Sequence, residues 1–145
     1  MVDVLTSIEI GRPISVVADY SADPDNAPKW YFNIKKVEWK TPRPLKVGTQ
    51  VAFVAHFLGK VLEYTYEIVD HAPGKRLRMR TAEGPFPMET TYEWEAIDDD
   101  HTRMTLRNQG EPAGFSKLFA PVMASMMRRQ NDKDLKNLKT VLEAV

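Results

Sequence analysis

Between Ile34 and Asn108 the sequence alternates apolar and polar residues with a period of two, in six successive runs. This alternation places neighbouring side chains on opposite faces of a β-strand. Short turn signals separate the runs, including Gly59-Lys60 and the three aspartates that end at Asp100. Because consecutive strands joined by short turns pair in antiparallel fashion, the pattern predicts an antiparallel meander with one apolar face.

Charged residues in the meander indicate which face meets water. Arginines alternate along residues 76–80, and glutamates alternate along residues 89–95 of the next run. Such residues on neighbouring strands form cross-strand ion pairs on a solvated face. The glutamates expected to face water are Glu63, Glu67, Glu89, Glu93 and Glu95.

Segments on both sides of the meander complete the expected fold. Residues 2–10 alternate cleanly and predict a first strand. Helical spacing after Pro13 predicts a short helix, and Asp23-Pro24 predicts the start of a second one that ends near Trp30 or Tyr31. Residues 115–143 predict one long helix, which is the element left to cover the apolar face of the sheet.

The apolar residues of this long helix do not form a single stripe. At about 100° per residue, those before Met127 gather on one side, whereas Leu135, Leu138 and Leu142 gather on a side rotated by roughly a third of a turn. The two halves should therefore have different surroundings, and Pro121 gives a local reason for a bend. The charged residues of the second half are expected to point to solvent: Asp132, Lys133, Asp134, Lys136 and Lys139.

Three methionines, Met123, Met126 and Met127, lie in the first half of the helix. Methionine adapts to irregular space and to changing partners, which suits the wall of a ligand cavity. The same side chains also suit a dry, irregular core, and the sequence leaves both interpretations open.

Composition narrows the possible classes of protein. Twenty basic side chains balance twenty acidic ones, so no net charge favours nucleic acid or an anionic membrane. The chain has no cysteine and only three scattered histidines, so neither a metal nor another cofactor is expected. The N-terminus lacks the features of a signal peptide, and no apolar run reaches the ~20 residues that span a bilayer. A single soluble, cytoplasmic domain over residues 1–145 is predicted.

No pattern of residues indicates a catalytic site. His71 and His101 fall at predicted turns, where a solvated histidine is expected, and His56 lies on the less apolar face of its strand. Arg107 and Arg129 could reach a ligand carboxylate, although solvated ion pairs are the simpler role. No carboxylate is evident on the inner face that burial could convert into a general acid or base. Catalytic residues are therefore unassigned, and the question whether the protein is an enzyme stays open.

Three stretches carry a family resemblance: IEIGRPISVVADYSADPDNAPKW, VGTQVAFVAHFLGKVLEYTYEIVDHAPGKRLRMRT and GFSKLFAPVMASMMRRQNDKDLKNLKTVLEA. Together with the order of elements, they resemble the START-like superfamily and, within it, the polyketide cyclase/dehydrase-like (SRPBCC) proteins. The resemblance covers the whole chain and includes no catalytic motif. It implies an α+β helix-grip fold, in which a curved antiparallel sheet wraps around a long C-terminal helix and leaves an apolar pocket between them.

The implied pocket would be lined by the apolar strand faces and the inner side of the first half of the helix. A few polar groups on such a wall orient a ligand, although each tyrosine could instead be a core residue whose hydroxyl reaches water. A continuous cavity of about 300 Å³ or more is expected. Trp30 is expected to close one side and Phe86 to lie at the rim. The expected lining residues are Trp30, Phe53, Ala55, Phe57, Tyr64, Tyr66, Met79, Thr81, Phe86, Thr90, Tyr92, Asn108, Phe119, Met123, Met126 and Met127.

Three functions fit these expectations, and the sequence favours the first. It is the binding or carriage of a hydrophobic or amphipathic small molecule such as a lipid, a quinone or a polyketide-like compound. The second is a polyketide cyclase or dehydratase that acts by positioning its substrate in the same cavity. The third is a protein-interaction module with a vestigial pocket. In each case neither nucleic acid nor integral membrane association is expected, and the protein should be a monomer or a weak homodimer.

Overall fold

The computed structural model describes residues 2–57, 59–83, 87–110 and 120–144. The elements follow one another in the predicted order. They are β1 (Val2–Ile10), α1 (Ile14–Ala22), the 3-10 turn η1 (Pro24–Asn26), α2 (Ala27–Trp30), β2 (Ile34–Trp39), β3 (Gln50–Phe57), β4 (Lys60–Ala72), β5 (Arg76–Glu83), β6 (Met88–Asp98), β7 (His101–Gly110) and α3 (Ala120–Glu143). The predicted helical residues 115–119 lie outside the described residues. As predicted, Asp23 caps the turn that begins at Pro24, because its carboxylate accepts a hydrogen bond from the backbone N–H of Asp25.

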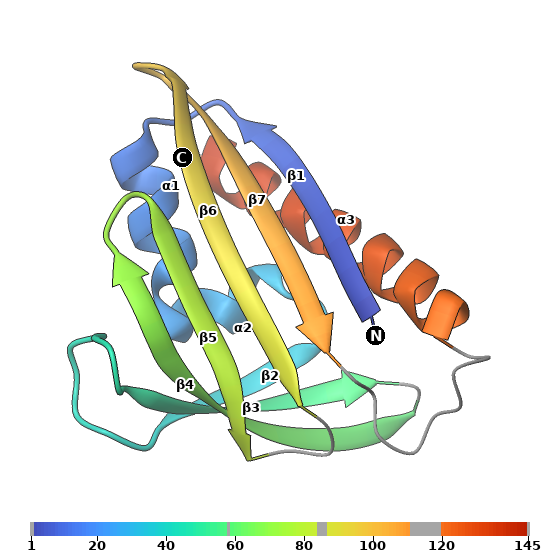
Figure 1. The fold of residues 1–145 in the computed structure, drawn as a ribbon. Coiled ribbons are helices and arrows are strands. Elements are labelled where there is room, and N and C mark those ends of the chain that lie inside the picture. Colours follow the sequence, from blue (N-terminus) through green and yellow to red (C-terminus); the bar gives the residue numbers. More distant parts are fainter. Residues whose placement is uncertain (1, 58, 84–86, 111–119, 145) are drawn as a thin grey trace.

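The seven strands form one antiparallel sheet in the order β1-β7-β6-β5-β4-β3-β2. The sheet curls, so that β2 and β3 run across the ends of the other strands (Figure 1). Register shifts between β4 and β5, at Thr65/Tyr66 and Ile68/Asp70, mark where the long strand β4 bends. The helices lie on the concave side, with α3 running behind β1 and β7 (Figure 1). This arrangement is the predicted helix-grip fold.

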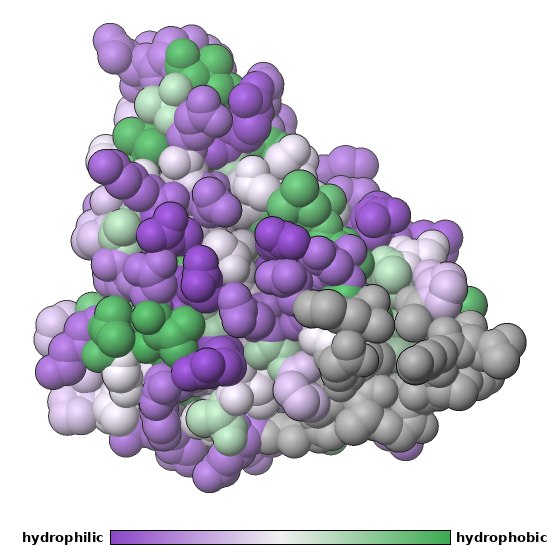
Figure 2. All heavy atoms as spheres, in the orientation of Figure 1, coloured by the Kyte–Doolittle hydropathy of each residue, from purple (hydrophilic) through white to green (hydrophobic). Residues whose placement is uncertain are grey.

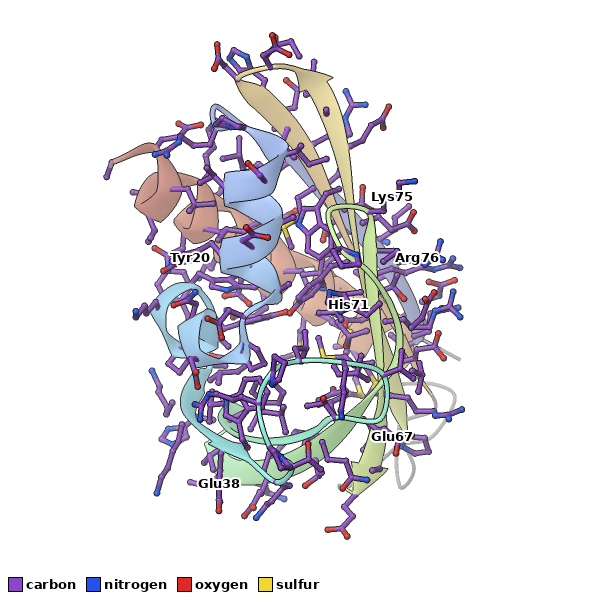
Figure 3. The ribbon with its side chains drawn as sticks, turned by 90° about the vertical axis from the view of Figure 1, so that its left-hand side faces the viewer. Tyr20, Glu38, Glu67, His71, Lys75 and Arg76 are labelled. Atoms are coloured by element: carbon purple, nitrogen blue, oxygen red, sulfur yellow. The ribbon has the colours of Figure 1, made fainter. Side chains whose placement is uncertain are left out.

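Charged side chains cover the convex face of the sheet, which is largely hydrophilic in Figure 2. Arg76 projects from the side of the sheet away from the helices (Figure 3), and its Nε lies 2.7 Å from a carboxylate oxygen of Asp70. Arg107 donates two hydrogen bonds to Asp3 on the neighbouring strand β1. This face is the solvated surface that the alternating charges predicted. His71 differs from the prediction, because it lies within β4 opposite Leu77 and not in a turn.

The two halves of α3 pack against different clusters of apolar residues, as the rotated stripe predicted. Leu135, Leu138 and Leu142 belong to the main core. Met123 packs instead against Val2 and Val4 of β1. The change occurs within one continuous helix, and Pro121 is only its second described residue, so the proline does not separate the two halves.

Polar contacts fix the second half of α3 in place. The side-chain amide of Asn137 donates to the backbone oxygen of Trp30 at the end of α2. Nearer the C-terminus, Lys139 donates to the backbone oxygen of Glu9, and Glu143 accepts from the backbone N–H of Gly11. These contacts fix the distance between α3 and the concave face of the sheet. The side chains of the first half of α3 do not fill the space between them completely.

Candidate ligand-binding site

A cavity of about 190 Å³ lies between the concave face of the sheet and the first half of α3. It is smaller than the 300 Å³ expected from the sequence. Strands β3 to β7 supply one wall, the segment after α2 supplies a second, and α3 closes the third. Its lining residues are Tyr31, Asn33, Ile34, Phe53, Ala55, Tyr64, Tyr66, Met79, Met88, Thr90, Tyr92, Asn108, Met123, Met127, Gln130, Asn131 and Asp134.

Ten of the residues singled out in the sequence meet at this cavity, because strand periodicity fixed which side chains point to the concave face. On the sheet they are Phe53, Ala55, Tyr64, Tyr66, Met79, Thr90, Tyr92 and Asn108, and on the helix they are Met123 and Met127.

Three of the expected residues lie elsewhere. Trp30 is completely buried in the main core, and its ring stacks at 4.0 Å from that of Tyr31, which faces the cavity in its place. The hydroxyl of Thr81 is bonded to the backbone of Met88 at 3.0 Å. Met126 lies outside the lining because Met123 and Met127 are four residues apart and share the inner row, whereas Met126 is rotated out of that row. The side chains of Phe57, Phe86 and Phe119 lie outside the described part of the structure.

Seven lining residues were not expected: Tyr31, Asn33, Ile34, Met88, Gln130, Asn131 and Asp134. Those on α3 had a detectable signal, since Met127, Asn131 and Asp134 follow the spacing of one helix face. Of the three, Asp134 was predicted to point to solvent because of its charge.

Asp134 corrects the prediction most clearly, because it is buried, with only 2% of its surface exposed. One carboxylate oxygen accepts hydrogen bonds from the backbone N–H of Phe32 and from the side-chain amide of Gln130, both at 3.0 Å. Burial raises the pKa of Asp134 to about 6, although these hydrogen bonds and nearby Lys133 act in the opposite direction. The cavity therefore contains a carboxyl group that changes its protonation near neutral pH.

Tyrosine hydroxyls lie on the sheet side of the same cavity. The hydroxyls of Tyr31 and Tyr92 are hydrogen-bonded to each other. Burial raises the pKa of both, and it raises the pKa of Tyr64 to about 12. These hydroxyls remain protonated at neutral pH. Within the pair of Tyr31 and Tyr92, one hydroxyl donates its proton to the other, which leaves one of the two able to donate a hydrogen bond to a ligand oxygen.

A second polar pair on the sheet is Thr90 and Asn108. The hydroxyl of Thr90 donates to the side-chain oxygen of Asn108 at 2.8 Å. This contact orients the Asn108 amide at the end of the cavity formed by β6 and β7.

The described residues that line the cavity include one carboxylate and no lysine, arginine or histidine. Arg107, which could have bound a ligand carboxylate, is exposed and paired with Asp3. Among the described side chains, no group of three histidines, aspartates or glutamates could hold a metal ion. The described lining residues therefore offer apolar contact, neutral hydrogen bonding and proton exchange at Asp134.

Residues 1–143 match the family model described as polyketide cyclase / dehydrase and lipid transport. The chain belongs to this family. The match covers nearly the whole sequence, so all the described residues that line the cavity lie within the matched region.

Among the relatives of this chain is an uncharacterized 17.2 kDa protein from the melC2-rnhH intergenic region of Streptomyces lincolnensis. It is 23% identical over 137 residues, which cover 94% of this chain and 87% of the relative. A START superfamily protein from Mycobacterium smegmatis has a similar structure, with a TM-score of 0.82 at 12% identity over 98% of this chain and 97% of that one. The ZhuI aromatase/cyclase from Streptomyces sp. R1128 also has a TM-score of 0.82, at 15% identity over 97% of this chain and 93% of that one. These structural similarities establish the fold of the family member described here, and its site must be judged by its own residues.

No helix in the described ranges is both long and apolar enough to cross a bilayer. The longest helix, α3, instead has charged residues along much of its second half.

Proposed function

We propose that the protein binds a small hydrophobic or amphipathic molecule in the cavity between the sheet and α3. The observation that carries this proposal is the 190 Å³ of unfilled space next to the inner methionines of α3. Packed interiors leave few voids larger than a water molecule, whereas this hollow, which is partly open to the surface, has room for a small ligand. The volume lies below the roughly 300–1,000 Å³ of pockets for drug-sized ligands, so it suits a compact molecule of one or two rings.

The character of the wall supports the same proposal. Nine of the seventeen described lining residues are aromatic or methionine, and six polar side chains lie among them. This combination is typical of small-molecule sites, in which apolar contact supplies affinity and a few hydrogen bonds fix orientation. Methionine side chains adjust to ligands of different shape at little cost.

Methionine methyl groups give a direct test. Four of the seven methionines line the cavity: Met79, Met88, Met123 and Met127. In NMR spectra of protein labelled with ¹³C at the methionine methyls, naphthalene should shift these four signals. Met104, which is completely buried in the main core, and Met126 serve as internal controls and should not move. Movement of all the signals alike, or of none, would reject binding at this site.

The natural ligand can be sought separately by native mass spectrometry of protein purified from its own host. A co-purified lipid or quinone would support a carrier, and the mass would identify its class.

A second candidate function is the cyclisation or dehydration of a carbonyl compound, and Asp134 is the observation that favours it. A buried carboxyl with a pKa of about 6 can act as a general base or a general acid near neutral pH. In a dehydration, Asp134 would take a proton from the carbon next to a carbonyl, while a tyrosine hydroxyl donates to the developing enolate oxygen. The β-hydroxyl group would then leave as water with the proton returned by Asp134.

A fluorescent product makes this reaction measurable. Loss of water from 3-hydroxy-1-tetralone gives 1-naphthol, whose fluorescence reports the rate. If the protein is a dehydratase, the rate should fall by at least about 100-fold in Asp134→Asn, which removes the proton-transferring group and keeps the shape. Equal rates with wild type, Asp134→Asn and no protein would reject this function and leave ligand binding untouched.

A further inference from the structure

Phe32 is the one exposed aromatic side chain among those that the structure describes, with 50% of its surface exposed. Its position follows from the backbone, which is extended at Tyr31. Because Tyr31 and Asn33 both line the cavity, the residue between them points away from it. The backbone N–H of Phe32 donates to Asp134, so this segment is fixed with the Phe32 ring on the outside.

The ring borders an open groove on the outer surface, together with two lysines of α3. Lys133 and Lys136 are exposed and are the only charged residues among the described ones that line this groove. Asn33 and Gln130 line both the groove and the cavity, so the groove is the outer side of a cavity wall. The complete lining is Phe32, Asn33, Gln130, Lys133, Lys136, Asn137 and Thr140.

The outer face of α3 carries an excess of positive charge around these lysines. Between residues 128 and 136, four cations are exposed against one exposed acid, Asp132. None of these cations forms an ion pair within the part of the chain that the structure describes. Three of them share one face of the helix, since they follow the spacing i, i+4 and i+7. The four cations are Arg128, Arg129, Lys133 and Lys136.

The balanced total charge of the chain conceals this local excess. On the convex face of the sheet, cations are paired with carboxylates, as Arg76 is with Asp70. The residues outside the described ranges add no net side-chain charge, because their only charged side chains are Glu111 and Lys117. The unpaired cations of α3 are therefore available to an external anionic surface.

An exposed aromatic ring beside lysines is suited to the surface of a membrane. The ring can enter the boundary between head groups and acyl chains, while the lysines reach anionic head groups on their long stems. The other side chains of the groove are polar, so a folded partner would find no further apolar surface there to pack against. A fluid bilayer, in contrast, can take up a single projecting ring.

We propose that the surface formed by Phe32, Lys133 and Lys136 docks on an anionic phospholipid bilayer. The contact is peripheral, and it places the bilayer on the other side of the wall that Asn33 and Gln130 share with the cavity. The proposal goes beyond ligand binding and does not depend on it, because the three docking side chains lie outside the cavity lining.

Sedimentation with vesicles tests the role of charge. Wild type should bind vesicles of phosphatidylcholine that contain about one-third phosphatidylglycerol, and should not bind vesicles of phosphatidylcholine alone. Lys133→Gln and Lys136→Gln should each lower the binding constant about fivefold, which is the contribution of one lysine near an anionic surface. Lys75→Gln is the matched control, since the turn between β4 and β5 lies apart from α3 (Figure 1), and its binding should stay within about twofold of wild type.

A fluorescent label at position 32 tests the role of the ring. Because the chain has no cysteine, Phe32→Cys can be labelled at this position alone with a nitrobenzoxadiazole dye. The emission of the dye should shift to the blue and gain intensity on anionic vesicles, as the dye leaves water. Val47→Cys, an exposed apolar position between β2 and β3, is the control and should show no change.

Three results would overturn membrane docking: equal binding to neutral vesicles, unchanged binding of both lysine variants, or unchanged emission of the dye at position 32. Binding of soluble polyglutamate without binding of vesicles would also overturn it, and would assign the lysines to an acidic protein. Naphthalene should still shift the cavity methionine signals in Lys133→Gln. Absence of these shifts in wild type would reject ligand binding, while the vesicle experiments would decide membrane docking separately.

Discussion

A carboxylate oxygen of Asp134 accepts a hydrogen bond from the backbone N–H of Phe32 at 3.0 Å, and this contact joins α3 to the segment between α2 and β2. Both sides of the contact border the cavity, because Tyr31 precedes Phe32 and Asn131 lies one turn before Asp134. The buried carboxyl is therefore at once a structural link between two walls and the ionisable group of the site. Its protonation should affect stability and ligand binding together.

The first prediction concerns the pH dependence of stability. The pKa of Asp134 is about 6 in the folded protein, compared with 3.8 as its ordinary value. Because the folded state holds this proton more tightly, the stabilisation from the group is complete below about pH 4 and is lost as pH rises through 6. The difference corresponds to a free energy of unfolding on the order of 3 kcal/mol.

Asp134→Asn isolates this contribution, since an amide oxygen can still accept from Phe32 and Gln130. Urea denaturation of both proteins between pH 4 and pH 8 provides the measurement. The stability of the variant relative to wild type should rise with pH across this range. A difference that stays constant would show that Asp134 does not titrate near pH 6.

The second prediction concerns the stability of variants in which leucine replaces Asn131 or Asn137. Asn131→Leu should raise the free energy of unfolding by about 1–3 kcal/mol, because it removes a buried donor that has no partner among the described residues and adds apolar contact. Asn137→Leu should lower it by a similar amount, because the backbone oxygens of Lys29 and Trp30 lose their donor. Denaturation curves at pH 7 without ligand test both. Loss of stability in both variants would mean that Asn131 has a structural partner after all.

The third prediction tests the hollow space by filling it. Met127→Trp should occupy the cavity, abolish naphthalene binding and change stability by less than about 1 kcal/mol. Met126→Trp is the matched control, since Met126 lies outside the lining, and it should retain binding. Thermal denaturation and NMR titration would be compared for both variants. Destabilisation of Met127→Trp by 3 kcal/mol or more would indicate overpacking of a filled core.

The fourth prediction concerns the hydroxyl pair of Tyr31 and Tyr92. Each single change to phenylalanine removes one hydroxyl and leaves the other without its partner, so each should cost about 1 kcal/mol. The double variant should cost clearly less than both changes together, because no unpaired hydroxyl remains. A double-mutant cycle in urea provides the measurement. Additive effects would show that the two hydroxyls do not interact in solution.

The sequence by itself determined the order of the six meander strands, β2 to β7, and the concave face of the sheet, whereas the pairing of β1 with β7 came from the tertiary structure. Because side chains alternate strictly along a strand, the parity of Phe53, Tyr66, Met79 and Tyr92 placed them all on the side that meets α3. The resemblance of the whole chain to the START-like superfamily then indicated that the C-terminal helix covers that face. The family model, which matches residues 1–143, agrees with this resemblance.

Only the tertiary structure decided which helix residues reach the cavity. Asp134 and Asn131 lie among charged and polar neighbours, and such a sequence ordinarily marks a solvated surface. Their burial depends on how the chain after α2 crosses α3, which brings the N–H of Phe32 to Asp134 and turns Tyr31 inward while Trp30 enters the core. Local periodicity carries no information about such a crossing, because it is set by contacts between residues about a hundred positions apart.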